Sequence, residues 1–127
     1  MIDSISEKII EDILTADKLI LSEVLSLNYS DLNLIARQKI LNSGKLDILY
    51  LYRDELLLIE LKVVPFYSGI VKQINDYEAD LIELQSQNKL INSKIKKIVI
   101  VTSAKQIDYK LCRDNNIEII TYKPETI

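Results

Sequence analysis

Residues 56–64 constrain the fold of this chain more than any other stretch. They read Leu-Leu-Leu-Ile-Glu-Leu-Lys-Val-Val, an apolar run that only Glu60 and Lys62 interrupt. Such a run is typical of a central strand that is buried on both faces. Residues two apart in a strand point the same way, so this carboxylate and this ammonium share one face. Burying charges costs free energy unless they are paired, hydrogen-bonded or bound to a metal. The strand therefore carries either a structural ion pair or a chemical site.

The composition narrows the chemistry of such a site. The chain has no histidine, which excludes His-based general-base catalysis and His-ligated zinc and leaves oxygen ligands for any metal. Its two glycines leave no room for a Gly-rich phosphate loop. The net charge of −3 means that nucleic-acid binding needs a local basic patch.

Length and apolar content place the chain in a broad class. Its 127 residues fit a single domain, 1–127, with one core. The lone Cys112 excludes an intrachain disulfide and fits a reducing cytoplasm. No apolar run approaches the roughly 18–20 residues that cross a bilayer, and the N-terminus lacks a signal-peptide core. We expect a cytoplasmic protein with no membrane partner.

The order of patterns predicts helix, helix, three strands, helix, strand, helix, strand. This is an α/β fold with a mixed sheet of about five strands flanked by helices. The predicted strands are 32–41, 45–52, 56–64, 98–101 and 117–122. The predicted helices begin at caps Ser4 or Ser6, Asp17, Ser68 and Ser103, and Ile107 and Leu111 face inward on the last one.

A short turn joins the strand 45–52 to the strand 56–64. If its loop has two residues, Tyr52 pairs with Glu55, and the same register places Asp47 opposite Glu60 with Cβ atoms about 4.5–5.5 Å apart. A register shifted by two residues places Asp47 opposite Lys62 on the same face, whereas a one-residue slip removes the cluster.

Two carboxylates at this separation repel each other and raise each other's pKa. A divalent cation between them, with Lys62 nearby, removes the difficulty. The structural alternative is an ion pair of Lys62 with Glu60 or Asp47 that has no further role.

Two pairs of residues on the helices extend this cluster. Glu7 and Glu11 lie one turn apart on the first helix, where the alternative is a solvated helix edge. Gln73 and Tyr77 are four residues apart and project together from the helix 68–86. Their structural alternatives are a boundary position for the glutamine and core packing for the tyrosine.

Together these residues carry a family resemblance. Gly44-x-x-Asp47-Ile48-Leu49, Ile59-Glu60-Leu61-Lys62 and Gln73-Ile74-x-x-Tyr77 resemble the PD-(D/E)XK nuclease superfamily, in its RecB-like branch, and most closely the NucS/EndoMS nuclease domain. Ser6-Glu7-x-x-Ile10-x-Asp12-x-Leu14 resembles the helix that opens that domain, and Arg37-Gln38 also matches it. The resemblance covers roughly residues 7–84. Leu46 stands where the superfamily has Pro before its Asp, and the resemblance does not extend to the N-terminal DNA-binding and dimerisation domain usual in NucS-like enzymes.

The resemblance implies a restriction-endonuclease-like αβββαβ core and a Mg²⁺- or Mn²⁺-dependent deoxyribonuclease. Asp47 and Glu60 would hold the metal, with the Leu61 carbonyl as the third protein ligand. Lys62 would orient or help deprotonate the attacking water.

The remaining residues of the motifs would support this centre. Glu7 is the better match to the family's helix glutamate and would approach the metal-bound waters, with Glu11 as the fallback. Gln73 and Tyr77 would position the region of Lys62 and the scissile phosphate.

DNA is the partner that the resemblance implies. Arg37, Lys39, Lys45 and the lysines between residues 89 and 97 could contact backbone phosphates, or be ordinary solvated cations. The expected substrate is branched, mismatched or single-stranded DNA in repair or recombination. One rival is an enzyme like a Holliday-junction resolvase, which works as a dimer and would make this chain a homodimer. Another is a non-catalytic nucleic-acid-binding or assembly module on the same fold.

Overall fold

The described residues build one mixed sheet. The computed structural model describes residues 7–16 and 18–122, with side chains for 8–14 and 18–122. In this part of the chain five strands lie in the order β1-β2-β3-β4-β5. The first three are antiparallel, and β4 and β5 continue the sheet in parallel with β3. The strands are β1 Leu32–Leu41, β2 Gly44–Tyr52, β3 Glu55–Leu61, β4 Lys94–Val101 and β5 Ile117–Thr121. The predicted α/β class with a mixed sheet is confirmed.

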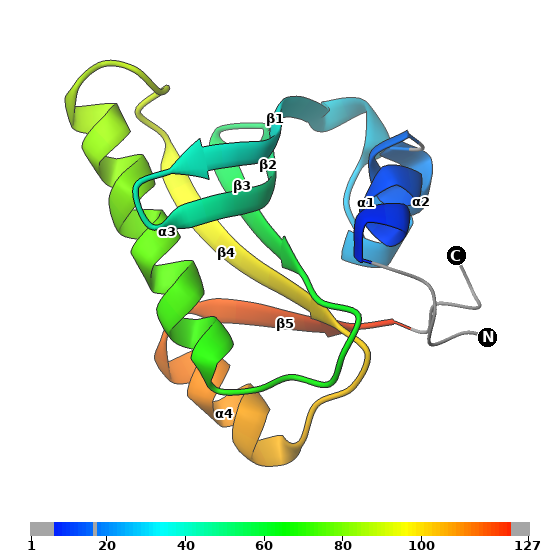
Figure 1. The fold of residues 1–127 in the computed structure, drawn as a ribbon. Helices are drawn as coiled ribbons and strands as arrows, with labels where there is room; N and C mark the ends of the chain where they lie inside the picture. The colour runs from blue at the N-terminus through cyan, green and yellow to red at the C-terminus, as the bar shows by residue number, and fades with distance from the viewer. Residues whose placement is uncertain (1–6, 17, 123–127) are drawn as a thin grey trace.

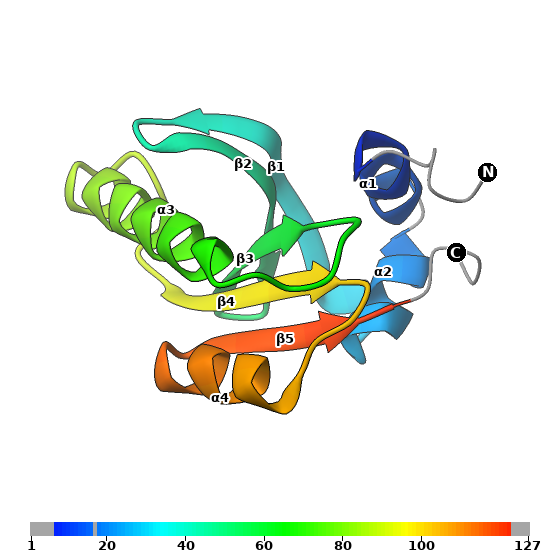
Figure 2. The same cartoon turned by 60° about the horizontal axis from the view of Figure 1, so that its bottom comes forward.

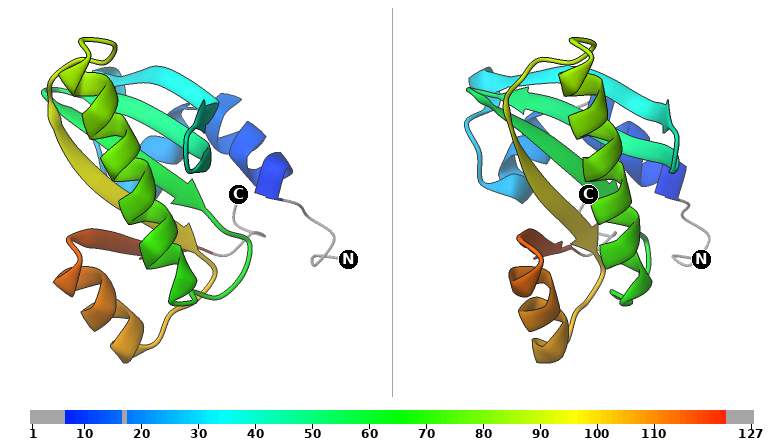
Figure 3. Two further views of the ribbon diagram at one scale, coloured as in Figure 1. Left: turned by 60° about the vertical axis from the view of Figure 1, so that its left-hand side comes forward. Right: turned by 90° about the vertical axis from the view of Figure 1, so that its left-hand side faces the viewer.

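Helices cover both faces of the sheet. The helices α1 (Glu7–Ala16) and α2 (Lys18–Leu25) lie on one face, and α3 (Gly69–Ser86) and α4 (Gln106–Asp114) lie on the other (Figures 1 and 2). Figure 3 shows α3 running along the sheet. A 3₁₀ turn, η2 (Tyr29–Asp31), leads into β1. None of the described helices is long and apolar enough to cross a bilayer. The predicted caps Ser4, Ser6 and Asp17 lie outside the described residues.

The central strand β3 separates two apolar cores, as its sequence predicts. Leu57, Ile59 and Leu61 pack toward α1 and α2, whereas Leu56 and Leu58 pack toward α3. All five are at most 1 % exposed. This burial on both faces explains why residues 56–61 are apolar at nearly every position.

Two strand boundaries differ from the prediction by more than one residue. β3 ends at Leu61 rather than at residue 64. The Lys62 N–H still donates to the Ile100 carbonyl at 2.9 Å, but Pro65 follows, which has no N–H to extend the ladder. β4 begins at Lys94 rather than at residue 98, because its lysine-rich half pairs with β3 from Glu55 onward.

The start of α4 also differs from the prediction. The helix begins at Gln106, and its cap is Lys105 rather than Ser103. The Lys105 N–H donates to the Asp108 carboxylate at 2.8 Å, which satisfies an N-terminal donor. Ile107, in the first turn, is 72 % exposed instead of inward, whereas Leu111 packs against the core as predicted. Ser68 precedes α3 as predicted, but its side chain makes no cap hydrogen bond.

Candidate functional site

The β2–β3 hairpin brings the two predicted acids together. Tyr52 pairs with Glu55 and the same register continues to the pair Ile48–Ile59, as the two-residue loop predicts. Beyond that pair the carboxylates replace backbone ladder bonds. The Asp47 N–H donates to Glu60 Oε1 at 3.2 Å, and the Leu61 N–H donates to Asp47 Oδ2 at 2.9 Å. Each acid is thus fixed by backbone of the other strand.

Lys62 lies beside this acid pair. Its Nζ is 3.7 Å from Glu60 Oε2, and the side chains of Lys62 and Glu60 are 14 % and 1 % exposed. The structure therefore contains the ion pair and the acid pair together. A lysine this close balances the negative charge of the buried Glu60.

Tyr77 anchors the start of β2 near the acids. Its hydroxyl donates to the Lys45 carbonyl at 3.0 Å and accepts from Gln73 Nε2 at 3.2 Å. Burial raises the pKa of Tyr77, the Gln73 hydrogen bond opposes this, and the Glu60 and Asp47 charges raise it further. The predicted pair on α3 therefore meets in the structure, with the tyrosine held against the strand that carries Asp47.

Gly44 is required where Tyr77 approaches. Its φ is +147°, a conformation that residues with a side chain rarely adopt, and an added Cβ would lie 2.9 Å from the Tyr77 hydroxyl. We expect Gly44→Ala to lower the free energy of unfolding by about 2 kcal/mol, from backbone strain and the clash together. Urea unfolding measures this loss.

A double variant separates the two causes. Tyr77→Phe alone removes a hydrogen bond and should cost about 1 kcal/mol. If the clash contributes, Gly44→Ala costs less in the Tyr77→Phe background than in the native chain. Equal costs in both backgrounds would assign the whole effect to backbone strain.

A pocket of about 360 Å³ opens beside Asp47. Its lining residues come from α1, β1, β2 and β3. They are Lys8, Glu11, Gln38, Lys45, Asp47 and Leu61. Glu11, which the sequence offered as the fallback helix carboxylate, is therefore at the site and only 2 % exposed. The side chain of Glu7 lies outside the described residues.

Residues of β1 hold Glu11 in place. Arg37 donates to Glu11 Oε2 from Nε at 2.9 Å and from Nη2 at 2.6 Å. Gln38 Nε2 donates to Glu11 Oε1 and lies 3.4 Å from Asp47 Oδ1. Arg37 also pairs with Asp12, and that hydrogen bond lowers the pKa of the Asp12 carboxyl.

The other predicted DNA-contacting residues lie near the tip of the β1–β2 hairpin. Lys45 is exposed and lines the pocket beside Asp47. Lys39 lines a separate hollow of about 400 Å³ between the tip and the end of α3, together with Lys89. The tip itself is tied down, because the Ser43 N–H donates to Asp80 on α3 at 2.9 Å.

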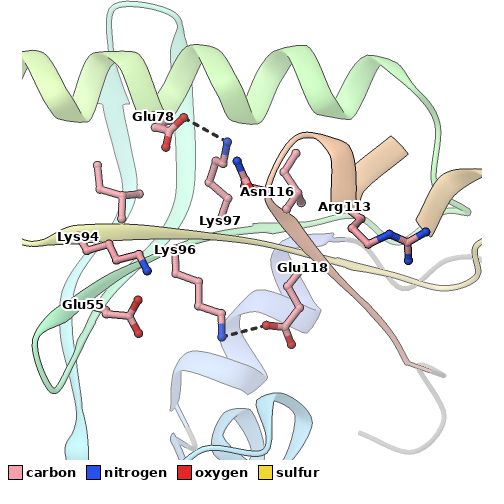
Figure 4. A pocket seen from close by; sticks show the side chains of 10 residues that line it. Glu55, Glu78, Lys94, Lys96, Lys97, Arg113, Asn116 and Glu118 are labelled. Atoms are coloured by element: carbon pink, nitrogen blue, oxygen red, sulfur yellow. Dashed lines mark hydrogen bonds and ion pairs between the residues drawn. The ribbon is translucent and has the colours of Figure 1, made fainter. Parts of the chain in front are cut away.

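The lysines of β4 lie at the opposite end of the sheet from Asp47. Lys94 pairs with Glu55, whereas Leu61 pairs with Ile100, six residues further along. These lysines line a larger pocket of about 820 Å³ (Figure 4). Figure 4 shows Lys97 bound to Glu78 on one side of β4 and Lys96 bound to Glu118 on the other. The larger pocket is therefore separate from the acid pair, and two of its lysines are neutralised.

The donors available for a metal ion are few. Within the described residues no group of three or more Cys, Asp or Glu side chains has the spacing of a metal site. The predicted ligand set needs only two carboxylates and a backbone carbonyl. Burial raises the pKa of the Cys112 thiol to about 11, so it stays protonated at neutral pH and is a poor nucleophile.

Two residues that line the pocket, Gln38 and Lys8, were not predicted as site residues from the sequence. Gln38 has φ +49° and lies between the β1–β2 pairs Arg37–Ile48 and Lys39–Leu46, which puts it across from Asp47. The sequence places Gln38 next to Arg37, but no sequence pattern predicts the positive φ that turns its side chain toward Glu11 and Asp47.

Comparison with known proteins rests on structure alone. No protein-family model and no curated protein matches the sequence. Three solved structures match at a probability of 1.00. A repair endonuclease from Pyrococcus abyssi has TM-score 0.68 and 18 % identity, over 95 % of this chain and 48 % of that chain.

The other two matching structures are of EndoMS. Its complex with double-stranded DNA has TM-score 0.61 and 20 % identity, over 87 % of this chain and 44 % of that chain. Its apo form has TM-score 0.67 and 18 % identity, over 95 % of this chain and 48 % of that chain. This chain thus spans somewhat less than half the length of each protein it matches. At these identities the likeness is one of fold, and the chain has the NucS/EndoMS-like nuclease fold that its sequence motifs predicted.

Proposed function

We propose that this chain is a nuclease domain that hydrolyses DNA phosphodiester bonds, in repair or recombination, with the help of Mg²⁺ or Mn²⁺. The observation that carries the proposal is the meeting of Asp47, Glu60 and Lys62 at one end of the β2–β3 pair, beside an open pocket. The likeness of fold to a repair endonuclease and to EndoMS bound to double-stranded DNA supports it.

The donor chemistry suits a hard divalent cation. Asp47 and Glu60 supply carboxylate oxygens from neighbouring strands, and the Leu61 carbonyl would be the third protein ligand. Mg²⁺ and Mn²⁺ prefer such oxygen ligands and keep several waters. When bound, the cation lowers the pKa of a coordinated water and stabilises the charge that builds on the phosphate oxygens.

The side chains around the acids would orient the reacting groups. Lys62, held 3.7 Å from Glu60, carries the positive charge that would orient the attacking water and balance the scissile phosphate. Gln73 and Tyr77 would act through position, since the tyrosine hydroxyl holds the strand two residues before Asp47. The exposed Lys45 is placed to contact a phosphate next to the pocket.

The test of this function is a cleavage assay on defined DNA. The protein is incubated with linear, nicked, mismatched, flapped, single-stranded and four-way-junction DNA in Mn²⁺, with an EDTA control for each. We expect metal-dependent cutting of branched, mismatched or single-stranded substrates. Light scattering on the same sample gives the oligomeric state, which is a homodimer if the protein works as a junction resolvase.

The alternatives predict other results. Selective cutting of the four-way junction by a dimer would favour the resolvase. Binding to DNA with no cutting of any substrate would overturn the enzyme and favour a non-catalytic nucleic-acid-binding module on this fold.

A further inference from the structure

Glu11 is a buried carboxylate on α1 that is held by hydrogen bonds from β1, in addition to the apolar packing of the helix. It is 2 % exposed and lies on α1, a helix of 10 residues. Isolated helices this short are marginal in water, so the position of α1 depends on what it packs against. Ile10 and Leu14 supply the apolar part of that packing. The polar part comes from two adjacent residues of β1, Arg37 and Gln38.

Arg37 satisfies one side of the Glu11 carboxylate. Two of its nitrogens, at 2.9 and 2.6 Å, contact the same oxygen, Oε2. The guanidinium also pairs with Asp12, so two carboxylates of α1 share one cation. With its side chain 33 % exposed, Arg37 is committed to the helix rather than extended into solvent. These two carboxylates offset the positive charge that the prediction of a DNA contact by Arg37 relies on.

Gln38 connects the other side of Glu11 to Asp47. Its backbone adopts φ +49°, a conformation that costs free energy for a residue with a side chain. Its Nε2 donates to Glu11 Oε1 and lies 3.4 Å from Asp47 Oδ1. An amide nitrogen has two protons and can serve two acceptors. Gln38 is thus placed between one carboxylate of α1 and one of β2.

The Gln38 amide between Glu11 and Asp47 reduces the repulsion between these two carboxylates. Two carboxylates that share a pocket repel, and the one on a short helix is the easier to displace. The cation of Arg37 and the amide of Gln38 offset that repulsion at Glu11 without using the Asp47 oxygen that accepts from Leu61.

We propose that Arg37 and Gln38 are positioning residues that hold Glu11 of α1 beside Asp47, so that Glu11 faces the waters of a divalent cation held by Asp47 and Glu60. This inference rests on the proposed function, because it assumes a cation held by Asp47 and Glu60. In this proposal the partner of Arg37 is Glu11 rather than a DNA phosphate.

The experiment measures Mn²⁺ affinity directly, by isothermal titration calorimetry and by electron paramagnetic resonance of free Mn²⁺. The variants are Arg37→Met, which keeps the apolar stem, and Gln38→Asn, which tolerates positive φ but shortens the reach of the amide. Loss of a residue that orients a ligand typically weakens metal binding about 10- to 100-fold, and we expect about tenfold for each variant. Arg53→Met is the matched control, since Arg53 pairs with Asp31 at the other end of β2 and should leave the affinity unchanged.

A double-variant cycle tests whether Arg37 acts through Glu11. Once Glu11→Gln has removed the carboxylate, adding Arg37→Met should change the Mn²⁺ affinity by less than about twofold, because the two residues act as one unit. Arg37→Lys keeps the charge but not the paired contact, and should fall between the native protein and Arg37→Met. It also serves as the test if Arg37→Met fails to fold by circular dichroism.

The outcomes distinguish a failure of the positioning role from a failure of the proposed nuclease function. If the native protein binds no Mn²⁺, or Asp47→Asn binds it as well as the native protein does, both fail. If the native protein binds Mn²⁺ through Asp47 but Arg37→Met and Gln38→Asn bind it equally well, only the positioning role is overturned. Weaker DNA binding by Arg37→Met in EDTA, with Mn²⁺ affinity unchanged, would likewise overturn it and restore Arg37 as a phosphate contact.

Discussion

Replacing Asp47 with asparagine is expected to lower the rate of DNA cleavage about 10³-fold, because in the proposed function it removes one of the two carboxylates that would hold the cation. Asparagine has nearly the shape of aspartate, and its amide oxygen can still accept the Leu61 N–H. The fold should therefore survive. Single-turnover cleavage of the best substrate in Mn²⁺, with circular dichroism as the check on folding, measures the effect.

The matched control lies on the same hairpin. Asp54 is an exposed residue of the β2–β3 turn, at the other end of the strand pair from Asp47. Asp54→Asn makes the same chemical change away from the site and should leave the cleavage rate unchanged. Retained cleavage in Asp47→Asn would mean that the acid pair does not form the catalytic centre.

Replacing Lys97 with alanine is expected to lower the free energy of unfolding by about 2–4 kcal/mol. Lys97 is 6 % exposed, and its Nζ donates to Asn75 at 3.0 Å and to Glu78 at 3.1 Å. Without it, the half-buried Glu78 loses its counter-charge and Asn75 loses a donor. Urea unfolding followed by circular dichroism measures the loss.

The neighbouring lysine is the control for this effect. Lys96 pairs with Glu118 at 3.0 Å, but these side chains are 40 % and 45 % exposed. Exposed ion pairs contribute about 0–1 kcal/mol, so Lys96→Ala should cost little. Figure 4 shows the two pairs on opposite sides of β4. An equal cost for both variants would contradict the role of burial, and a double variant Lys97→Met with Glu78→Gln should recover part of the loss.

The central strand and the pairing of Asp47 with Glu60 follow from local sequence. The apolar run 56–61 predicts a strand buried on both faces, because only such a strand needs apolar side chains on both sides. The hairpin register that places Asp47 opposite Glu60 follows from a two-residue loop, and the pairs from Tyr52–Glu55 to Ile48–Ile59 agree with it. Residues this close along the chain have few ways to pair.

Other features depend on contacts that the local pattern does not report. The lysines that open β4 look like a polar connection, yet they pair along β3, and Lys97 is buried because α3 supplies Glu78 and Asn75. Ile107 looks like a core residue, yet it is exposed in the first turn of α4, where Leu111 and Cys112 make the core contacts. For Lys97, partners distant in sequence decided the environment.

The sequence by itself determined the central strand, the hairpin and the meeting of Asp47, Glu60 and Lys62, since periodicity and a short turn fix these over a few residues. Only the tertiary structure decided that Glu11 faces the pocket and that Arg37 and Gln38 hold it there. That contact joins α1 to β1 across 26 and 27 residues of chain, and it depends on how the helix docks on the sheet and on a positive φ at Gln38. No periodic pattern in the sequence encodes either one.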